Sequence, residues 1–294
     1  MARQLRIQFP GALYHITHRG NERKSIFSGN TDKETFLDIL SFVIDRFDWR
    51  CHAYVLMPNH YHLLIETPKA NLSRGMMQLN SIYTQRFNRT HNRVGHLFQG
   101  RFKSILVEKE QYLLELSRYI VLNPVRARLV THPGEWEWCS YNATIGKITK
   151  PDFLTVEWIL SQFGNNKRKA ILSYIEYVNN GYAVEFPHEE LVGEAILGTE
   201  KFLDKVNFHL NEEGIQNIKE IPRTQRYSPR TQLDEIFQKG MRAGKSRDQL
   251  IFTVYKDYDF TMSEIADYLE VHYATVSRAI KAEEKKNQMW QCKT

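Results

Sequence analysis

The strongest constraint on the fold is a pair of strand-like runs that flank the dipeptide Pro58-Asn59. The run WRCHAYVLM occupies residues 49–57, and the run HYHLLIE occupies residues 60–66. Both runs are largely apolar, and a Pro-Asn dipeptide between two such runs is typical of a tight turn. The two runs therefore predict antiparallel neighbouring strands.

The remainder of residues 1–150 alternates between strand-like and helix-like patterns. Mixed alternation of apolar and polar residues indicates a half-buried strand, whereas apolar residues three and four apart indicate a helix. Strands are predicted in this way at 12–19 and 101–108, and helices from the capping sequence Thr31-Asp32-Lys33-Glu34, at 72–91 and at 110–123, where Pro124 stops the helix. The resulting order, β-α-β-β-α-β-α, predicts an α+β fold, a ferredoxin-like palm with an antiparallel sheet and a trailing helix.

Beyond this palm, the sequence predicts an all-α region that ends in a helix-turn-helix domain. Residues 151–222 show helical segments joined by Gly, Asn and Pro turns and are expected to form a helical connector. The segment 223–230 lies within a basic run with two prolines, and it is expected to be a linker. We therefore expect one domain at 1–150 and another at 231–294.

The helix-turn-helix prediction depends on the stretch TMSEIADYLEVHYATVSRAIKAEEK at 261–285. A first helix would place Ile265, Ala266 and Leu269 inward, and a second helix from Tyr273 would place Val276 and Ile280 inward. The outward residues of the second helix would then face a major groove. A three-helix bundle used for protein contacts is the alternative.

Composition narrows the possible partners. The chain has 294 residues, 40 Lys+Arg against 34 Asp+Glu, a formal charge of +6 and a pI near 9.0, which favours a polyanionic partner. Neither an apolar signal-peptide core nor an apolar run of membrane-spanning length is evident, so we expect a cytoplasmic protein without a membrane partner. The three cysteines are far apart and indicate neither a disulfide framework nor a thiolate zinc site.

Two histidines point to chemistry in the strand at 60–66. Alternate residues of a strand share a face, so His60 and His62 point one way while Tyr61 points the other. Two imidazoles on one face make either two ligands of a metal ion or a pair of phosphate contacts. Histidines that simply pack or lie at the surface are the alternative.

A second group of candidate residues lies in SRYIVLNPVRA at 117–127. Tyr119 and Asn123 are four residues apart, so a helix presents a phenol and a carboxamide on one face. If this helix packs near the histidine strand, His60, His62 and Asn123 would be three neutral ligands with positions left for phosphate oxygens. Tyr112 is the rival nucleophile, but the residue four positions later, Leu116, cannot bind a metal.

Three blocks of sequence carry a family resemblance: MPNHYHLLIE, HNRVGHLFQGRFKSILVE and YLLELSRYIVLNPVRARLV. Together they resemble the signature blocks of the HUH single-strand transposases with one catalytic tyrosine, and the whole chain resembles a REP-associated tyrosine transposase. The resemblance is strong over residues 3–146 and implies a ferredoxin-like palm. It also implies a Mg²⁺ or Mn²⁺ ion held by His60, His62 and Asn123, and a 5′-phosphotyrosine link between Tyr119 and single-stranded DNA. In some insertion-sequence relatives the third ligand is Gln.

Basic and polar side chains near each motif are expected to contact DNA, and some of them alternate along the predicted fourth strand. Phe9, Tyr14 and Tyr83 could stack on bases, although aromatic residues at such positions are more often in the core. The expected DNA contacts are Arg3, Arg6, Arg19, Asn21, Arg23, Arg86, Arg101, Lys103, Arg118 and Arg126 in the palm, and Tyr273, Thr275, Ser277, Arg278 and Lys281 in the C-terminal domain.

The sequence therefore predicts a metal-dependent transposase or nickase that cleaves and rejoins hairpin-associated single-stranded DNA, with duplex DNA as a second partner of the C-terminal domain. Two alternatives remain open. One is a replication-initiator-type nickase, and the other is a domesticated hairpin-binding transcriptional regulator without cleavage activity. A monomer is expected.

Overall fold

The chain forms two units, Met1–Glu220 and Ile221–Thr294, and each has its own hydrophobic core. The computed structural model describes residues 7–183, 186–187, 190–192, 195–212, 233–257, 260 and 262–291. The expected linker at 223–230 lies outside the described residues, so the domain boundaries remain a prediction. The two units are described separately below.

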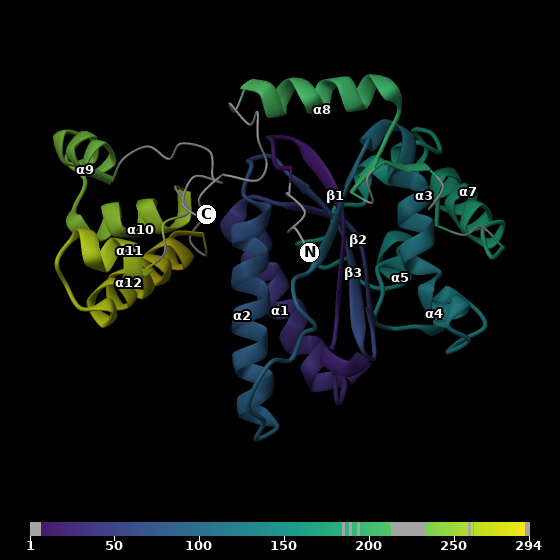
Figure 1. Cartoon of the computed structure of the whole chain (residues 1–294), viewed down its shortest axis with the longest axis horizontal. Coiled ribbons are helices and arrows are strands. Elements are labelled where there is room, and N and C mark those ends of the chain that lie inside the picture. Colours follow the sequence, from purple (N-terminus) through teal and green to yellow (C-terminus); the bar gives the residue numbers. More distant parts are fainter. Residues whose placement is uncertain are drawn as a thin grey trace. The chain divides into compact units, whose positions relative to one another are not determined.

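The N-terminal unit contains the predicted succession of strands and helices and is of the α+β class. Four antiparallel strands lie in the order β2-β3-β1-β4, with α1 and α2 on one face and α3 on the other (Figure 1). The elements in chain order are β1 (Ala12–Arg19), η1 (Asn21–Arg23), α1 (Asn30–Phe47), β2 (Arg50–Met57), β3 (His60–Thr67), α2 (Leu72–Thr90), β4 (Lys103–Val107) and α3 (Lys109–Val121).

The start of α1 differs in detail from the sequence prediction. The helix begins at Asn30, and no side chain caps its first turn in the expected way. Asp32 instead accepts a hydrogen bond from the Ser28 backbone N–H at 2.7 Å and pairs with His91 at 2.9 Å. This acid therefore ties the helix start to the end of α2, a contact that local sequence cannot show.

The sheet is mixed, which corrects the expectation of a purely antiparallel sheet and an all-helical connector. Strands β5 (Leu191–Val192) and β6 (Ile196–Leu197) extend it, and β6 runs parallel to β4. The Leu106 N–H donates to the Ala195 carbonyl at 2.8 Å, which satisfies backbone groups that β4 would otherwise leave unpaired at an edge. Strands of two residues are too short to show a period in the sequence.

Several helices follow α3 and pack on the same core. Bridges from Cys139 to Val55 and from Leu154 to Cys51 cover the outer edge of β2. The remaining elements of this unit are α4 (Asn123–Arg126), η2 (Pro133–Glu135), α5 (Tyr141–Thr144), α6 (Glu157–Ser161), α7 (Lys167–Asn179) and α8 (Glu200–Glu212).

The C-terminal unit is helical in its described residues. Its helices are α9 (Leu233–Arg242), α10 (Arg247–Asp257), α11 (Met262–Tyr268) and α12 (Tyr273–Gln291). Ile265, Ala266, Val276 and Ile280 are buried as expected from the sequence, and Leu269 is partly buried. Across the part of the chain that the structure describes, no helix is long and apolar enough to cross a membrane.

Candidate active site

The two histidines of β3 face α3, while the tyrosine between them faces α1 and α2. Tyr61 is fully buried, packs against Phe36 with ring centroids 4.8 Å apart and donates a hydrogen bond to Asn80 Oδ1 at 2.8 Å. The rings of His60 and His62 lie on the other face with centroids 5.1 Å apart. Strand alternation thus separates a packing residue from two residues that can bind a ligand.

His62 is buried and lies against a histidine of the neighbouring strand. Its Nδ1 is 2.9 Å from His15 Nε2, and the two rings are stacked, 12° from parallel. Burial lowers the pKa of His62 well below its usual value, and the charges of neighbouring histidines and of Arg19 and Arg126 lower it further. His62 is therefore neutral at neutral pH, the form in which an imidazole binds a metal.

His60 is held by the turn residue before it. Its Nδ1 lies 2.7 Å from Asn59 Oδ1, and the Asn59 amide nitrogen donates to the Arg23 carbonyl at 3.0 Å. A carbonyl only accepts, so the nitrogen of Asn59 must face Arg23 and its oxygen must face His60. His60 Nδ1 therefore carries the proton and Nε2 carries the lone pair. Burial first, and Arg19 second, lower the pKa of His60 to about 4.

Tyr119 on α3 is half-buried beside these histidines. Its ring lies edge-on to His15 and His62, with centroids 6.0 Å away in both cases, and the Arg126 guanidinium is 4.7 Å from its centre. Phe186 from the connector lies edge-on to Tyr119 at 5.1 Å. Burial raises the pKa of Tyr119, and the positive charge of Arg126 acts against that increase.

Asn123 lies one turn beyond Tyr119, at the start of α4. Its amide nitrogen donates to the Tyr119 carbonyl at 2.9 Å, and Arg126 donates to the same carbonyl at 2.8 Å. Because that carbonyl can only accept a hydrogen bond, the Asn123 nitrogen must be the atom bonded to it. The Asn123 oxygen keeps its lone pairs and can bind a metal ion. The helix break before Pro124 thus keeps a carboxamide next to the tyrosine.

The rival tyrosine is in a different environment. Tyr112 is buried, and its hydroxyl donates to the Glu190 carboxylate. Burial, followed by the hydrogen bond and charge of Glu190, raises its pKa to about 12. The charge of Glu190 disfavours the Tyr112 phenolate, whereas the charge of Arg126 favours the Tyr119 phenolate.

The chemistry of the donor set fits a divalent cation. His60 and His62 are neutral, and Asn123 offers an amide oxygen, so each candidate ligand has a suitable donor atom. Among the residues that the structure describes, no group of three or more His, Cys, Asp or Glu side chains is arranged to hold a metal ion. The candidate set contains only two such residues, and its third member is an amide.

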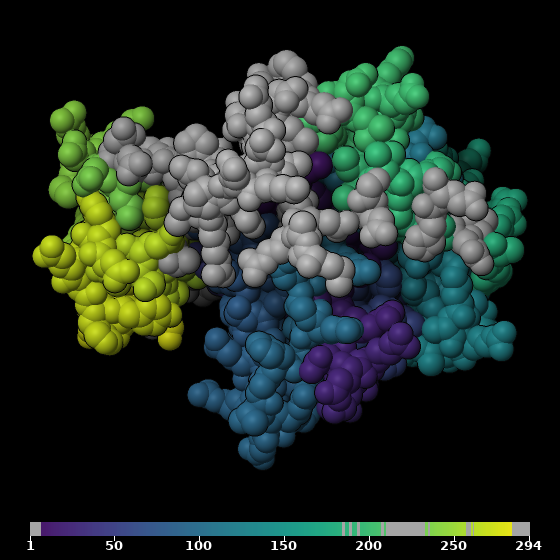
Figure 2. Space-filling view, in the orientation of Figure 1, coloured from purple at the N-terminus to yellow at the C-terminus, as the bar shows by residue number. Residues whose placement is uncertain are grey.

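Several of the expected DNA contacts gather at the His60 end of the sheet. The Gly20 segment pairs with Phe98, and the Asn21 N–H donates to the Leu97 carbonyl at 2.8 Å, so two segments distant in sequence share one surface (Figure 2). Thr17 pairs with both His62 and Lys103, which places Lys103 on the same face as the histidines. Exposed side chains in this region are Arg19, Arg23, Arg86, Arg101 and Lys103, and Asn21 is half-buried.

Other expected contacts lie elsewhere. Arg101 precedes β4, so it does not alternate with Lys103 within that strand as expected. The Arg118 side chain contacts α7. Its guanidinium lies 4.2 Å from the centre of the Tyr177 ring and donates a hydrogen bond to the Tyr177 carbonyl at 3.4 Å. Arg126 is the one that reaches Tyr119. Arg3 and Arg6 lie outside the described residues.

The aromatic residues considered for base stacking, Phe9, Tyr14 and Tyr83, are buried in the core. In the C-terminal unit, Tyr273, Arg278 and Lys281 are exposed, whereas Thr275 and Ser277 are half-buried.

Three residues that contact the site had no role predicted from the sequence: His15, Asn59 and Phe186. His15 and Thr17 lie on the same face of β1, and Thr17 pairs with His62 on β3. The pairing of these two strands would therefore have shown that His15 faces the site. Asn59 directly precedes His60 and was recognisable only as a turn residue. Phe186 follows Tyr119 by more than sixty positions, a separation at which no local pattern operates.

Part of the N-terminal unit is similar to a known protein family. Residues 9–123 match the family model described as Transposase IS200 like, and no curated protein matches the chain. A solved structure of a REP-associated tyrosine transposase bound to a REP hairpin is similar at 16% identity and a TM-score of 0.44, covering 57% of this chain and 93% of that chain. A candidate transposase from Deinococcus radiodurans R1 is similar at 17% identity and a TM-score of 0.30, covering 40% of this chain and 95% of that chain. Residues 9–123, which contain β1 to β4, α3 and the candidate site, thus resemble the IS200-like transposase family.

Proposed function

We propose that the N-terminal unit cleaves and rejoins single-stranded DNA through a covalent bond between DNA and Tyr119. The observation that carries this proposal is the position of Tyr119, whose ring lies edge-on to His62 and within 4.7 Å of the Arg126 guanidinium. A nucleophile, a neutral imidazole and a cation are thus neighbours inside a domain that resembles the IS200-like transposase family. The chain contributes all three from its own β3, α3 and α4.

The proposed reaction is a transesterification. The Tyr119 phenol loses its proton, its oxygen forms a bond to the phosphorus of a phosphodiester, and the bond from phosphorus to the 3′ oxygen breaks. The 3′ oxygen takes up a proton and leaves as a hydroxyl, while the 5′ end stays attached to Tyr119. A later attack by a 3′ hydroxyl reverses these steps and joins strands, so no external energy source is needed.

Each residue of the site would have a separate task. Arg126 stabilises the phenolate that Tyr119 must form, since a nearby positive charge favours the charged state. A Mg²⁺ or Mn²⁺ ion held by His60, His62 and Asn123 would polarise the phosphodiester and stabilise its added negative charge. The hydrogen bond that His60 Nδ1–H donates to Asn59 Oδ1 keeps His60 in the tautomer whose Nε2 can bind that ion.

The basic surface beside the site would hold the phosphates of a DNA hairpin and its single-stranded flank. No aspartate or glutamate occurs between Glu66 and Glu108. Exposed positive charge attracts a polyanion, and binding should weaken as salt rises. The exposed basic residues of that stretch near the site are Arg86, Arg101 and Lys103.

For the C-terminal unit, we propose that α11 and α12 act as a helix-turn-helix and bind duplex DNA. Support comes from the exposed side chains of Tyr273, Arg278 and Lys281 along α12, opposite the buried Val276 and Ile280. A monomer would then use one unit for single-stranded hairpins and the other for duplex. The alternative for this unit is a bundle that contacts proteins.

Two other functions share parts of this site. A replication-initiator-type nickase would use the same tyrosine chemistry on a different target. A hairpin-binding regulator would keep the basic surface but would not form a bond to DNA. The arrangement of His60, His62, Tyr119 and Asn123 favours an active enzyme over the regulator, because a protein that only binds DNA has no use for a neutral ligand set beside a tyrosine.

The test is formation of a covalent adduct. Labelled single-stranded hairpins from the genomic neighbourhood are incubated with the protein and Mn²⁺, and a denaturing gel shows whether label stays on the protein. We expect an adduct with the wild type and with Tyr112→Phe, which removes a hydroxyl remote from the proposed chemistry, and none with Tyr119→Phe. Hairpin binding without any adduct, for all tested ions, would favour the regulator.

A further inference from the structure

A second histidine pair lies behind the proposed ligands: His15 on β1 and His62 on β3. We propose that His15 is a positioning residue, which accepts a hydrogen bond from the Nδ1–H of His62 and so keeps the His62 Nε2 lone pair available to a metal ion. This inference rests on the proposed function only in naming a metal ion as the ligand. The tautomer of His62 that it predicts belongs to the free protein and can be measured by itself.

Strand pairing places the two rings in contact. Thr17 pairs with His62 and His15 pairs with Leu64, so His15 and His62 are diagonal neighbours on the same face. Their nitrogens are 2.9 Å apart, a hydrogen-bonding distance, and both side chains are buried, at 3% and 7% exposure. One imidazole must therefore donate to the other, because two lone pairs at this distance would repel.

The charges around His62 decide which ring donates. If His15 donated, His62 would hold its proton on Nε2, away from His15. Arg19 pairs with His60 and His15 pairs with Leu64, so Arg19 lies on the side of His62 away from His15, and its positive charge acts on His62 together with that of Arg126. An outward lone pair is favoured by these charges and an outward N–H is disfavoured. The arrangement with His62 as donor has the lower electrostatic energy.

His60 shows the same arrangement with a different partner. Its Nδ1–H donates to Asn59 Oδ1 at 2.7 Å, which leaves Nε2 unprotonated. With His15 as acceptor for His62, both histidines of β3 would present Nε2 to one ligand. Histidines that bind metals generally donate their other ring N–H to a neighbouring group in this way. Asn59 and His15 would thus play equivalent parts for the two ligands.

His15 itself is held in place from two sides. The Tyr119 ring lies edge-on to it, with centroids 6.0 Å apart at 79°, and Phe186 packs at 5.4 Å. One buried ring therefore touches a proposed ligand and the proposed nucleophile. Its loss should disturb the orientation of His62 more than the backbone fold, because β1 and β3 pair over their full length.

The test compares His15→Gln with His15→Leu in the full-length chain. The Gln side chain can place an acceptor near the position of His15 Nε2, whereas Leu fills similar space without one. Nitrogen NMR of the imidazoles, with His62 assigned through a His62→Gln variant, reports the tautomer in the absence of metal. Calorimetry with Mn²⁺ reports the dissociation constant, and circular dichroism confirms that each variant is folded.

We expect His62 to be protonated on Nδ1 in the wild type and in His15→Gln, with similar Mn²⁺ affinity for both. In His15→Leu we expect a shift toward the Nε2–H tautomer and Mn²⁺ affinity weaker by about 10- to 100-fold, as for other groups that orient metal ligands. A wild-type His62 protonated on Nε2 would overturn the proposal, and so would a folded His15→Leu with unchanged tautomer and affinity. If His15→Leu does not fold, the wild type and His15→Gln still decide the tautomer. If no variant binds Mn²⁺, the metal proposal fails while the tautomer result stands.

Discussion

At the scale of single residues, the site is determined by which polar atom of each side chain is already bonded. Asn123 uses its nitrogen on the Tyr119 carbonyl, and His60 uses Nδ1 on Asn59. The Tyr119 carbonyl and the Asn59 amide oxygen can only accept hydrogen bonds, so Asn123 and His60 must donate to them. The Asn123 oxygen and the His60 Nε2 then keep their lone pairs for a ligand. The proposed ligand atoms are therefore already oriented by hydrogen bonds within the protein.

Arg126 is expected to lower the pH at which Tyr119 reacts. Because its positive charge opposes the pKa increase that burial causes, Arg126→Met should raise the Tyr119 pKa further. Adduct formation should then slow at neutral pH and recover as pH rises toward the new pKa. Rates of adduct formation measured across a pH series test this.

Arg118, on α3, offers a matched control for Arg126. Arg118 lies 4.2 Å from the centre of the Tyr177 ring, an arrangement similar to that of Arg126 and Tyr119. Burial raises the pKa of Tyr177, and the charge of Arg118 opposes that increase at Tyr177 rather than at Tyr119. Arg118→Met should therefore leave the pH profile of adduct formation unchanged. Equal effects of the two substitutions would contradict the role given to Arg126.

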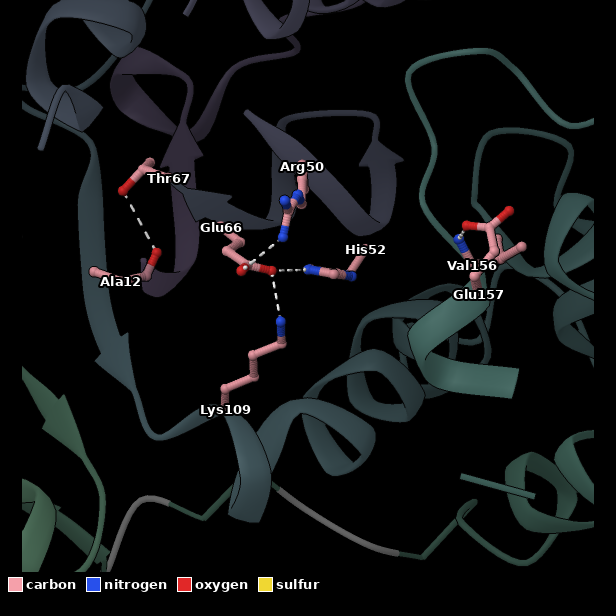
Figure 3. A network of polar contacts seen from close by, with 8 residues as sticks. All are labelled: Ala12, Arg50, His52, Glu66, Thr67, Lys109, Val156 and Glu157. Carbon is pink, nitrogen blue, oxygen red and sulfur yellow. Dashed lines mark hydrogen bonds and ion pairs between the residues drawn. The ribbon is translucent and has the colours of Figure 1, made fainter. Parts of the chain in front are cut away.

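At the scale of elements, Lys109, the first residue of α3, forms an ion pair with the buried carboxylate of Glu66 in the sheet. Glu66 accepts hydrogen bonds from His52 and Lys109, both at 2.8 Å, and pairs with Arg50 at 3.3 Å (Figure 3). Lys109 begins α3, and Glu66 lies on β3 beyond the two histidines. This contact helps to set the position of α3, and therefore of Tyr119, relative to the histidines.

The contacts of Glu66 with His52, Lys109 and Arg50 should make the free energy of unfolding depend on pH. Burial disfavours the Glu66 carboxylate, but hydrogen bonds from His52 and Lys109 and their charges outweigh it and lower its pKa from 4.5 to about 2. A lowered carboxyl pKa contributes stability that is complete above pH 4.5 and is lost as pH falls toward 2. The expected loss of unfolding free energy is about 3 kcal/mol, and urea titrations at several pH values measure it.

The control is Glu66→Gln, which keeps the shape but cannot ionise. It should be less stable at pH 7, and its unfolding free energy should lack this part of the decline between pH 4.5 and 2. A variant with the same decline as the wild type would show that other carboxyl groups cause it.

The elements that local sequence predicts well are those with long periodic runs. Residues 12–121 show strand and helix periods over at least five residues, and the structure confirms their order. Alternation places His60 and His62 on one face of a strand, and helical spacing places Tyr119 near Asn123; their roles remain a prediction. By contrast, β5 and β6 have two residues each, and the contacts of His15, Arg118 and Phe186 depend on register and on packing between distant segments. Such contacts have no local signal.

At the scale of the whole molecule, two separate hydrophobic cores imply that the units fold independently. The core of the first unit includes residues of the sheet, of α1 to α3 and of the connector helices, whereas the second is built from α9 to α12. Since the connector residues belong to the first core, the palm is not expected to fold well without them.

A chain ended after Glu220 tests this independence. Residues 1–220 should unfold in one cooperative transition and should still form the covalent adduct, because every residue of the candidate site lies within them. Affinity for duplex DNA should fall strongly, and fluorescence titration with duplex and hairpin probes measures both. A chain ended after residue 150 should be much less stable. Unchanged duplex affinity in 1–220 would contradict the proposed role of α12.

The most direct test of the account is to identify the amino acid that carries DNA after cleavage. The adduct formed with Mn²⁺ is digested with protease and nuclease, and mass spectrometry locates the residue that retains a nucleotide. We predict a nucleotide joined through its 5′ phosphate to Tyr119. A nucleotide on any other residue, or cleaved strands with no modified peptide, would contradict the account.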